Sequence, residues 1–294
     1  MKKVYGCVRL IRPINCLMTG LAVYVGLCIT LRRIPEYTYI TKIAPSYITG
    51  FALCGASMAI NDYFDLPIDR INAPNRPIPS GTVSPNLALT LSIAMLVIGL
   101  ISALTTSPIC LLYATLFAAL SYLYSWKLKR LGFIGNIAVS LCVSAPFVYG
   151  GLTALTITDI CKSGRSGGFL LLLLFSSIAF LANLGREVTK SIADMEGDRA
   201  HGVKSLAVRY GARTACITAS IFYLAAVALS LIPPILGIVS KYYYPFIISV
   251  DLGFLYSISK LSRSLSRDTA LSVKNTVLFL MLVGLIGFML GGLT

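Results

Sequence analysis

The stretch GFLLLLLFSSIAFLANLGRE, residues 168–187, carries no charged side chain before its last two positions. A bilayer core about 30 Å thick is crossed by roughly 20 apolar residues in a helix. Runs of this kind recur along the chain, which is 56% hydrophobic, only 12% charged and has a mean hydropathy of +0.82. The sequence therefore predicts an all-α membrane protein rather than a soluble domain.

Nine apolar runs are long enough to predict membrane-spanning helices. They cover residues 14–31, 43–61, 84–104, 107–126, 132–154, 168–187, 213–232, 243–260 and 275–293. The first run follows Arg9, Arg12 and Pro13 and has no small-residue cleavage site behind it, so we expect a retained helix and not a signal peptide. We expect a single transmembrane domain over residues 1–294, built as one bundle.

Basic residues are distributed unevenly between the two sets of helix ends that nine spans create. All but six of the 25 Lys and Arg residues fall at the N-terminus or after the second, fourth, sixth and eighth runs. The six exceptions are Arg32, Arg33, Lys42, Lys162, Arg165 and Lys241. Because cytoplasmic loops retain the Lys and Arg excess, we expect a cytoplasmic N-terminus. The net charge of +14 is then explained by membrane orientation and by attraction to anionic lipid headgroups. Nucleic-acid binding is not expected, because no aromatic stacking platform accompanies the charge.

The cysteines and the single histidine do not predict a disulfide framework or a metal site. Six of the eight cysteines lie in or at the ends of apolar runs, where they are expected to pack: Cys16, Cys28, Cys54, Cys110, Cys142 and Cys216. Cys7 and Cys161 fall near opposite membrane faces, and no CxxC pattern occurs. His201 lies in a predicted loop, where a solvated side chain is expected.

Acidic residues are rare, and seven of the eleven fall in two short windows. The first window, NDYFDLPID at residues 61–69, holds Asp62, Asp65 and Asp69. The second holds Glu187, Asp194, Glu196 and Asp198. A carboxylate near hydrocarbon costs about 2.5–3.5 kcal/mol on insertion scales, and neighbouring like charges add to that cost. The clustering therefore predicts that something positive lies between the acids.

The spacing of the first window places its polar groups on one side of a helix. Asn61, Asp65 and Asp69 are four residues apart and share a stripe, with Asp62 beside it. Pro67 clashes with helical geometry in the preceding turn, so the helix is expected to kink or end near Asp65.

The second window repeats this arrangement. Glu187, Lys190, Asp194 and Asp198 are spaced three, four and four residues apart along one stripe, with Lys190 as a charge partner and Glu196 turned away. Both windows follow even-numbered runs, so both are expected on the same side of the membrane.

A shared offset indicates an internal duplication. Asp62 and Asp194 are 132 residues apart, and so are LYSWKLKR, from Leu123, and LYSISKLSR, from Leu255. This predicts two four-helix pseudo-repeats, about 1–131 and 132–263, followed by a final helix at about 275–293. The two acidic windows then face one another across the bundle.

Two facing sets of carboxylates suit Mg²⁺, which commonly completes its coordination with substrate phosphates and water. The basic residues of the same face are expected to take the remaining phosphate charge, although each of them also contributes to membrane orientation. These residues are Arg76, Lys127, Lys129, Arg130, Lys190 and Lys204. The pattern predicts a lipid diphosphate with its head at the mouth of the bundle and its tail among the helices.

The same residues carry a resemblance to a known family. NDYFDLPID resembles the N-D-x-x-D-x-x-x-D first motif of UbiA-type intramembrane prenyltransferases, and DMEGD at 194–198 resembles their D-x-x-x-D second motif. RPIN at 12–15, NRPIPSG at 75–81 and YSWKLKR at 124–130 occur in the family's order, so the resemblance covers the whole chain. The segment 185–211 looks most like the archaeal members that add a geranylgeranyl chain to a glycerol phosphate precursor of membrane lipid.

This resemblance implies an Mg²⁺-dependent transfer at the cytoplasmic side of the cell membrane. The implied metal ligands are Asn61, Asp62, Asp65, Asp69, Asp194 and Asp198, and Asp65, Asp69, Asp194 and Asp198 among them are the implied catalytic residues. The implied substrate-binding residues are Asn15, Arg76, Tyr124, Lys127, Lys129, Arg130, Lys190 and Lys204. The geranylgeranyl group of geranylgeranyl diphosphate would pass to the glycerol hydroxyl of geranylgeranylglyceryl phosphate and form the second ether bond. No obligate protein partner is implied.

Two features of the resemblance leave alternatives open within the site. Tyr63, Tyr122 and Tyr124 are expected either to shield an allylic cation with their ring faces or to anchor helix ends at the interface. Asn15 and Arg12 resemble family positions near the cavity, and an Arg-Pro pair is also an ordinary start for a helix.

Three other functions are compatible with parts of the pattern. The acceptor can instead be aromatic, such as 4-hydroxybenzoate, a naphthoate or a related quinone or chlorin precursor. A cation-coupled transporter also uses intramembrane acids in repeated halves, but such sites lie near the midplane, whereas these windows lie at helix ends. A non-catalytic lipid-binding protein predicts no dependence on Mg²⁺.

Overall fold

The computed structural model describes residues 2–157 and 166–293, and the regular elements within these ranges are helices. The long helices are α2 (Pro13–Leu31), α3 (Ile40–Phe64), α5 (Pro85–Thr106), α6 (Pro108–Trp126), α7 (Phe133–Ile157), α8 (Ser166–Ala193), α11 (Ala212–Ser230), α13 (Tyr243–Arg263) and α14 (Arg267–Gly292). The short elements are α1 (Lys2–Ile11), η1 (Tyr37–Tyr39), α4 (Leu66–Asn72), η2 (Leu128–Leu131), α9 (Met195–Ala200), α10 (Leu206–Tyr210) and α12 (Ile232–Ile235). Cys161, Lys162 and Arg165 lie outside the described residues.

Eight helices in the described residues are long and apolar enough to cross a membrane. They correspond to the predicted runs, with the exception of 243–260. That run forms α13, a helix of 21 residues, but Asp251 and several tyrosines and serines lower its hydropathy. The all-helical membrane fold is confirmed, whereas nine spans and a cytoplasmic N-terminus stay predictions.

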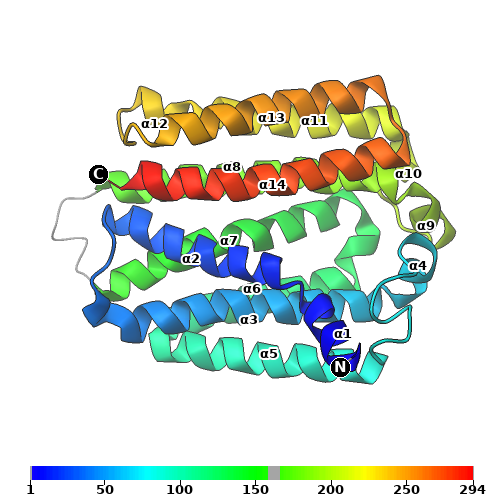
Figure 1. The fold of residues 1–294 in the computed structure, drawn as a ribbon, viewed down its shortest axis with the longest axis horizontal. Helices are drawn as coiled ribbons and strands as arrows, with labels where there is room; N and C mark the ends of the chain where they lie inside the picture. The colour runs from blue at the N-terminus through cyan, green and yellow to red at the C-terminus, as the bar shows by residue number, and fades with distance from the viewer. Residues whose placement is uncertain (1, 158–165, 294) are drawn as a thin grey trace.

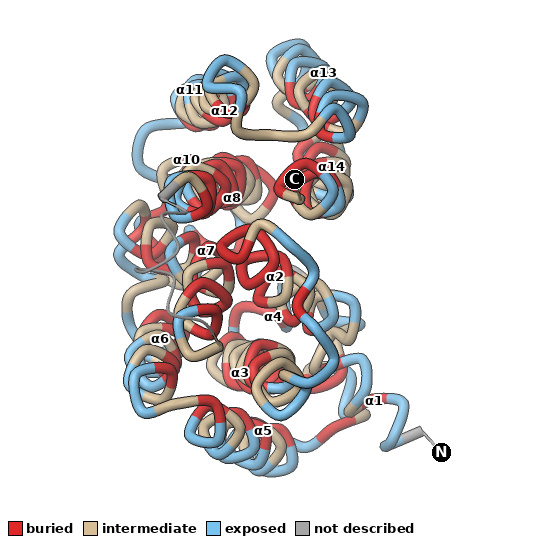
Figure 2. The backbone as a smooth tube through the Cα atoms, turned by 90° about the vertical axis from the view of Figure 1, so that its left-hand side faces the viewer, coloured by how far each residue is buried: buried red, intermediate tan, exposed pale blue. Residues whose placement is uncertain are grey.

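The long helices lie side by side along the longest axis of the molecule (Figure 1). The short helices α4, α9 and α10 gather at one end of the bundle, and α1 lies toward the same end. Seen end-on, α8, α11, α13 and α14 form one group, and α2, α3, α5, α6 and α7 form the other (Figure 2). The two groups join where α7 and α2 pack against α8 and α14.

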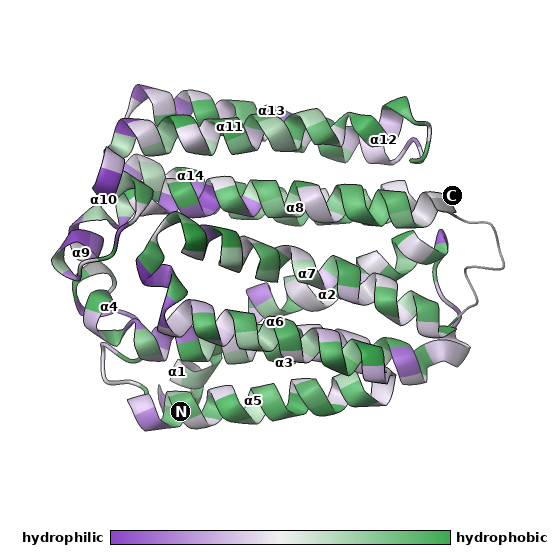
Figure 3. Ribbon diagram, turned by 180° about the vertical axis from the view of Figure 1, so that it is seen from behind, coloured by the Kyte–Doolittle hydropathy of each residue, from purple (hydrophilic) through white to green (hydrophobic). Residues whose placement is uncertain are grey.

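The outer surface of the bundle is apolar, as a lipid-facing surface must be. Leu112, Leu116 and Phe279 are each more than 60% exposed on the long helices. Hydrophobic residues run along the length of the helices, while hydrophilic residues are prominent at the end that carries α4, α9 and α10 (Figure 3). This end is called the polar end below.

Helices α2 and α7 approach so closely that their contact requires glycine. A Cβ atom on Gly26 would overlap the backbone of Phe147, and one on Gly150 would overlap the backbone of Val23. Small residues at such crossings let helices in a membrane pack through their backbones. This close contact fixes the junction between the two helix groups.

The helix ends differ from the predicted ones where a helix continues past charged residues at the end of an apolar run. Helix α8 continues six residues beyond residue 187. Helix α14 begins at Arg267 instead of residue 275. The Ser266 hydroxyl caps α14 by accepting a hydrogen bond from the Thr269 amide at 3.2 Å. Charges end an apolar run without ending the helix, because backbone hydrogen bonding continues through them. Lys274 therefore lies inside α14 and not in a loop.

The N-terminal segment contains an amphipathic helix, α1, that the sequence analysis did not predict. Arg12 separates α1 from α2 and adopts a left-handed conformation, with φ 51°, just before Pro13. A residue before proline is disfavoured in the right-handed helical region, so the break falls here.

Candidate active site

The first acidic window is divided between two helices. Helix α3 ends at Phe64, α4 begins at Leu66, and Asp65 lies between them. The Asp65 amide donates to the Asn61 carbonyl at 2.9 Å, and the Asp69 amide donates to the Asp65 carbonyl at 2.8 Å. The four-residue spacing therefore survives the interruption. The predicted break near Asp65 is confirmed, and Pro67 falls in the first turn of α4, where a missing N–H is tolerated.

The second window has the same design without a proline. Helix α8 ends at Ala193, α9 begins at Met195, and Asp194 lies between them. The Asp194 amide donates to the Lys190 carbonyl at 3.1 Å, and the Asp198 amide donates to the Asp194 carbonyl at 2.9 Å. Helices α4 and α9 contact each other at the polar end, so the two windows meet. The interrupting residues, Asp65 and Asp194, are 129 positions apart and not 132, so the proposed pseudo-repeats stay a prediction.

Each acid of the first window is paired with a cation. Arg12 Nη2 lies 2.6 Å from Asp62 Oδ1, and Arg76 pairs with Asp69 and, at 3.5 Å, with Asp62. All of these carboxylates are buried, with side chains 2–6% exposed. The prediction that positive groups lie among the acids is confirmed, because buried carboxylates of this kind require a counter-charge.

Asp65 contacts one amide and one cation. Its Oδ2 atom accepts a hydrogen bond from Asn61 Nδ2 at 2.7 Å and pairs with Lys129. Burial alone would raise the pKa of Asp65, but the cations Lys129, Lys190 and Arg76 together outweigh it and hold that pKa below its ordinary value. Asp69 differs, because burial outweighs Arg76 and raises its pKa.

In the second window the charges are arranged around the helix interruption. Glu187 is buried and pairs with Arg186 at 2.9 Å and with Lys190 at 3.7 Å. Burial and the neighbouring Asp194 raise the pKa of Asp198 to about 6. Lys190 belongs to the second window, and its charge acts on Asp65 of the first window as well as on Asp198. Glu196 is exposed, as predicted.

The residue types at the polar end fit Mg²⁺, but their present partners are cations. Among the described residues no three His, Cys, Asp or Glu side chains are placed to hold a metal ion. One oxygen atom of each first-window carboxylate contacts a cation, which is Arg12, Arg76 or Lys129.

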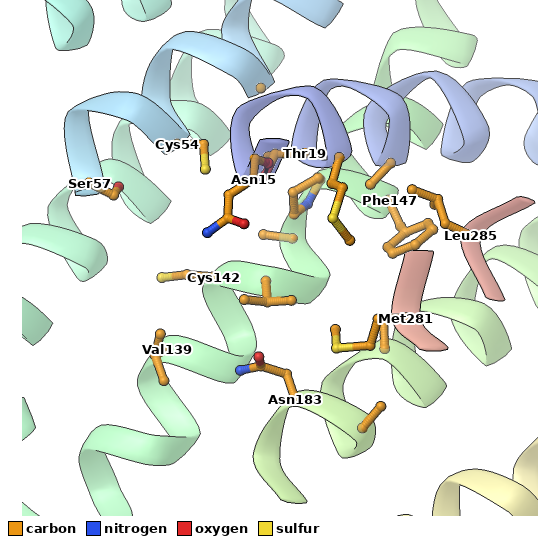
Figure 4. A pocket seen from close by; sticks show the side chains of 18 of the residues that line it. Asn15, Thr19, Cys54, Ser57, Val139, Cys142, Phe147, Asn183, Met281 and Leu285 are labelled. Atoms are coloured by element: carbon orange, nitrogen blue, oxygen red, sulfur yellow. Dashed lines mark hydrogen bonds between the residues drawn. The ribbon is translucent and has the colours of Figure 1, made fainter. Parts of the chain in front are cut away.

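A cavity of about 360 Å³ extends from this charged region into the bundle. Its polar lining includes Arg12, Asn15, Asn61, Arg76, Tyr124, Asn183, Arg186, Glu187, Lys190, Asp251 and Lys274, and its apolar lining includes Phe147, Val250, Met281, Leu285 and Phe288. Asn15, Asn183, Cys142, Met281 and Leu285 line the region shown in Figure 4. Volumes of ~300–1,000 Å³ are typical of small-molecule sites. The cavity therefore provides a charged mouth and an apolar interior.

The predicted substrate-binding residues fall into two groups. Asn15, Arg76, Tyr124 and Lys190 line the cavity, and Lys129 reaches Asp65 beside it. The other three side chains, Lys127, Arg130 and Lys204, are exposed. The Lys127 ammonium lies 5.7 Å from the centre of the Trp126 ring, and the Lys204 amide donates to the Arg130 carbonyl at 3.2 Å.

Only one of the three candidate tyrosines lines the cavity. Tyr124 is buried against it, whereas the Tyr122 hydroxyl lies 2.6 Å from that of Ser92, and Tyr63 packs against a small cluster around Leu10. Residues two apart on a helix point in nearly opposite directions, so Tyr122 and Tyr124 cannot share one site.

The sequence did not predict that two further cationic residues, Arg186 and Lys274, line the cavity. Arg12, expected either near the cavity or as an ordinary helix start, lines the cavity and forms the 2.6 Å ion pair with Asp62. Arg186 and Lys274 were assigned only to membrane orientation, yet both line the cavity. A lysine or arginine within an apolar helix is itself a signal of function, and it could have identified Arg186 in the run 168–187, whereas Lys274 lies just before the run 275–293.

Comparison with known proteins agrees with this geometry. The model of the UbiA prenyltransferase family matches residues 19–283. A digeranylgeranylglyceryl phosphate synthase of Pyrococcus abyssi is 35% identical over 294 residues, which cover 99% of both chains. A solved structure described as giving insights into digeranylgeranylglyceryl phosphate synthase in membranes is 30% identical, with a TM-score of 0.74, over 100% of this chain and 99% of that one.

A more distant structure shares the fold. A UbiA homologue of Archaeoglobus fulgidus, solved with DMAPP and Mg²⁺, has a TM-score of 0.64 and 17% identity over 95% of this chain and 99% of that one. The family match extends over most of the chain, and the Pyrococcus relative over nearly all of it. This multi-pass membrane protein, with two interrupted acidic helices meeting over an apolar cavity, belongs to the UbiA prenyltransferase family.

Proposed function

We propose that this chain transfers a geranylgeranyl group from geranylgeranyl diphosphate to the glycerol hydroxyl of geranylgeranylglyceryl phosphate. The observation that carries the proposal is a charged mouth continuous with an apolar cavity. Full-length relatives 35% identical to the chain bear the name of the synthase for this product, which supports the choice of substrates. The reaction breaks the bond between the allylic carbon and the diphosphate oxygen, forms an ether bond and releases the hydroxyl proton.

The first acidic window and its cations are assigned to the diphosphate. Asn61, Asp65, Asp69, Asp194 and Asp198 would hold Mg²⁺, with Asp62 adjacent, and the bound ion supplies charge neutralisation for the leaving group. Arg12, Arg76 and Lys129 now neutralise the acids. With the acids engaged elsewhere, these three cations are positioned to bind phosphate oxygens.

The apolar part of the cavity is assigned to the prenyl chain. Residues such as Phe147, Leu285 and Phe288 would surround the chain and keep water from the allylic carbon as its bond to oxygen breaks. Tyr124 lines the cavity from α6, where its ring can stabilise developing positive charge. We propose that the mouth faces the cytoplasm, because most of the Lys and Arg residues lie at helix ends on its side.

The test is a competition between acceptors. Purified protein in detergent is given labelled geranylgeranyl diphosphate with geranylgeranylglyceryl phosphate, 4-hydroxybenzoate and a naphthoate together. We expect label only in the ether lipid, no product with a chelator and full recovery when Mg²⁺ is restored. A prenylated aromatic product would overturn the proposed acceptor, and turnover that persists in excess chelator would overturn the metal site.

A further inference from the structure

The cavity contains a second cluster of cations, on helices other than those that carry the first window. Arg186 and Lys190 come from α8 and Lys274 comes from α14, and all three line the cavity. Lys274 interacts electrostatically with Arg186 and Lys190, so the three belong to one cluster. The first set, Arg12, Arg76 and Lys129, comes instead from the α1–α2 junction, the segment after α4, and η2.

The two cationic sets differ in how they are neutralised. In the first set, every cation has its own ion pair with a buried Asp. In the second set, the only carboxylate in ion-pair contact among the described residues is Glu187, which pairs with Arg186 and Lys190. Three cations thus share one carboxylate in ion-pair contact, and Lys274 forms no ion pair with any described residue.

Two further observations indicate that the cluster of Arg186, Lys190 and Lys274 binds an anion. The Nε atom of Arg186 is buried and has no hydrogen-bond partner in the described part of the chain, although an arginine in a buried setting ordinarily uses its donors. Lys274 has no ion pair there either. Asp194 lies near enough to act on Lys274, but it belongs to the acids assigned to the metal. Uncompensated charge within a membrane protein is costly, and an anionic ligand removes that cost.

We propose that Arg186, Lys190 and Lys274 bind the phosphomonoester of the acceptor lipid, separately from the diphosphate of the donor. A phosphomonoester carries a charge of about −1.5 to −2 near pH 7 and three acceptor oxygens, which matches the unpaired charge and donors of this cluster. The assignment rests on the proposed function. It gives each substrate its own cationic set and places the acceptor against α8 and α14.

The test substitutes Lys274, because Lys274 forms no ion pair with any described residue and its loss leaves no carboxylate without a partner. The Michaelis constants of both substrates are measured for the wild type, Lys274→Met and Lys274→Arg. Loss of one charge-assisted contact is expected to raise KM for geranylgeranylglyceryl phosphate about 10- to 100-fold, with KM for geranylgeranyl diphosphate within about twofold of wild type. Lys274→Arg should recover most of the affinity. Lys260→Met is the matched control, since the Lys260 ammonium donates to Ser272 of α14 at 2.7 Å and does not line the cavity.

A second measurement uses the wild type alone and does not depend on folding of a variant. Geranylgeranylglycerol, which lacks the phosphate, is compared with the phosphorylated acceptor, and we expect its KM to be at least about 100-fold higher because several charged contacts are lost. The inference is overturned if the two acceptors are used equally well, if Lys274→Met leaves the acceptor KM unchanged, or if both KM values rise together. A wild type that forms no ether product from either acceptor overturns the proposed function instead.

Discussion

Asp65→Asn separates the structural role of this carboxylate from its role in the reaction. Asp65 is buried at the interruption between α3 and α4 and accepts hydrogen bonds from Asn61 and Lys129 through the same oxygen. Asparagine keeps the shape and one acceptor atom but removes the charge. The Lys129 side chain, only 18% exposed, then lacks its counter-ion.

Asp65→Asn is expected to lower the stability of the protein because Lys129 loses its counter-ion. Removing one partner of a fully buried pair costs about 3–5 kcal/mol, and the partial exposure of Lys129 reduces this to about 2 kcal/mol. Asp65→Asn should therefore lower the unfolding midpoint by several degrees, and Lys129→Met in the same chain should restore much of that loss. Thermal unfolding in detergent measures both variants.

The expected loss of activity has a different origin and should not be restored. A missing metal ligand is expected to reduce turnover at least about 100-fold, comparable with the loss of a stabilising group that contacts the reacting oxygen atoms. Asp65→Asn/Lys129→Met should thus be stable and inactive. Glu196→Gln is the matched control, because Glu196 lies in the second window but is exposed, and it should retain wild-type turnover. Turnover of Asp65→Asn within threefold of wild type would refute the assignment of Asp65 to the metal.

Three further predictions concern the walls of the cavity. Arg12→Gln removes the 2.6 Å partner of Asp62 and a cation assigned to the diphosphate, so KM for the donor should rise about tenfold or more; an unchanged donor KM would contradict that assignment. Tyr124→Phe should keep most of the turnover and Tyr124→Leu should lose about 2- to 30-fold, the range of a cation–π contact; equal rates in the two variants would remove the ring from the mechanism. Gly26→Val would place side-chain atoms against the backbone of Phe147, so the yield of monodisperse protein on size exclusion should fall sharply, and a normal yield would show that α2 and α7 can separate without loss of the fold.

The features predicted from sequence are those fixed by neighbouring residues. Apolar runs predict spans because hydropathy is a local average, and they located eight helices correctly. Four-residue spacing placed Asn61 beside Asp65, where a 2.7 Å hydrogen bond now joins them. Pro67 predicted the interruption in the first window. The matching interruption at Asp194 was missed, because no proline marks it.

The features that were missed depend on packing between distant segments. Nothing near Tyr122 and Tyr124 in the sequence says which of them faces the cavity, since that depends on how α6 is rotated against α5 and α7. Lys274 was placed before the last span, because counting apolar residues treats a charge as a boundary. The position of Lys274 in α14 is explained by the structure, which brings Lys274 and Arg186 of α8 to the same cavity, where an anion has room to bind.

The helix interruptions at Asp65 and Asp194 allow a contact between the two windows that straight helices could not make. Helices α3 and α8 do not pack against each other in the described structure, since α2 and α7 lie between them (Figure 2). Their extensions α4 and α9 nevertheless contact one another. A one-residue interruption changes the direction of the chain while the four-residue hydrogen-bond spacing continues, so the acids on either side keep a common face. The interruptions therefore bring two acidic windows together over the mouth while their parent helices stay apart to enclose the cavity.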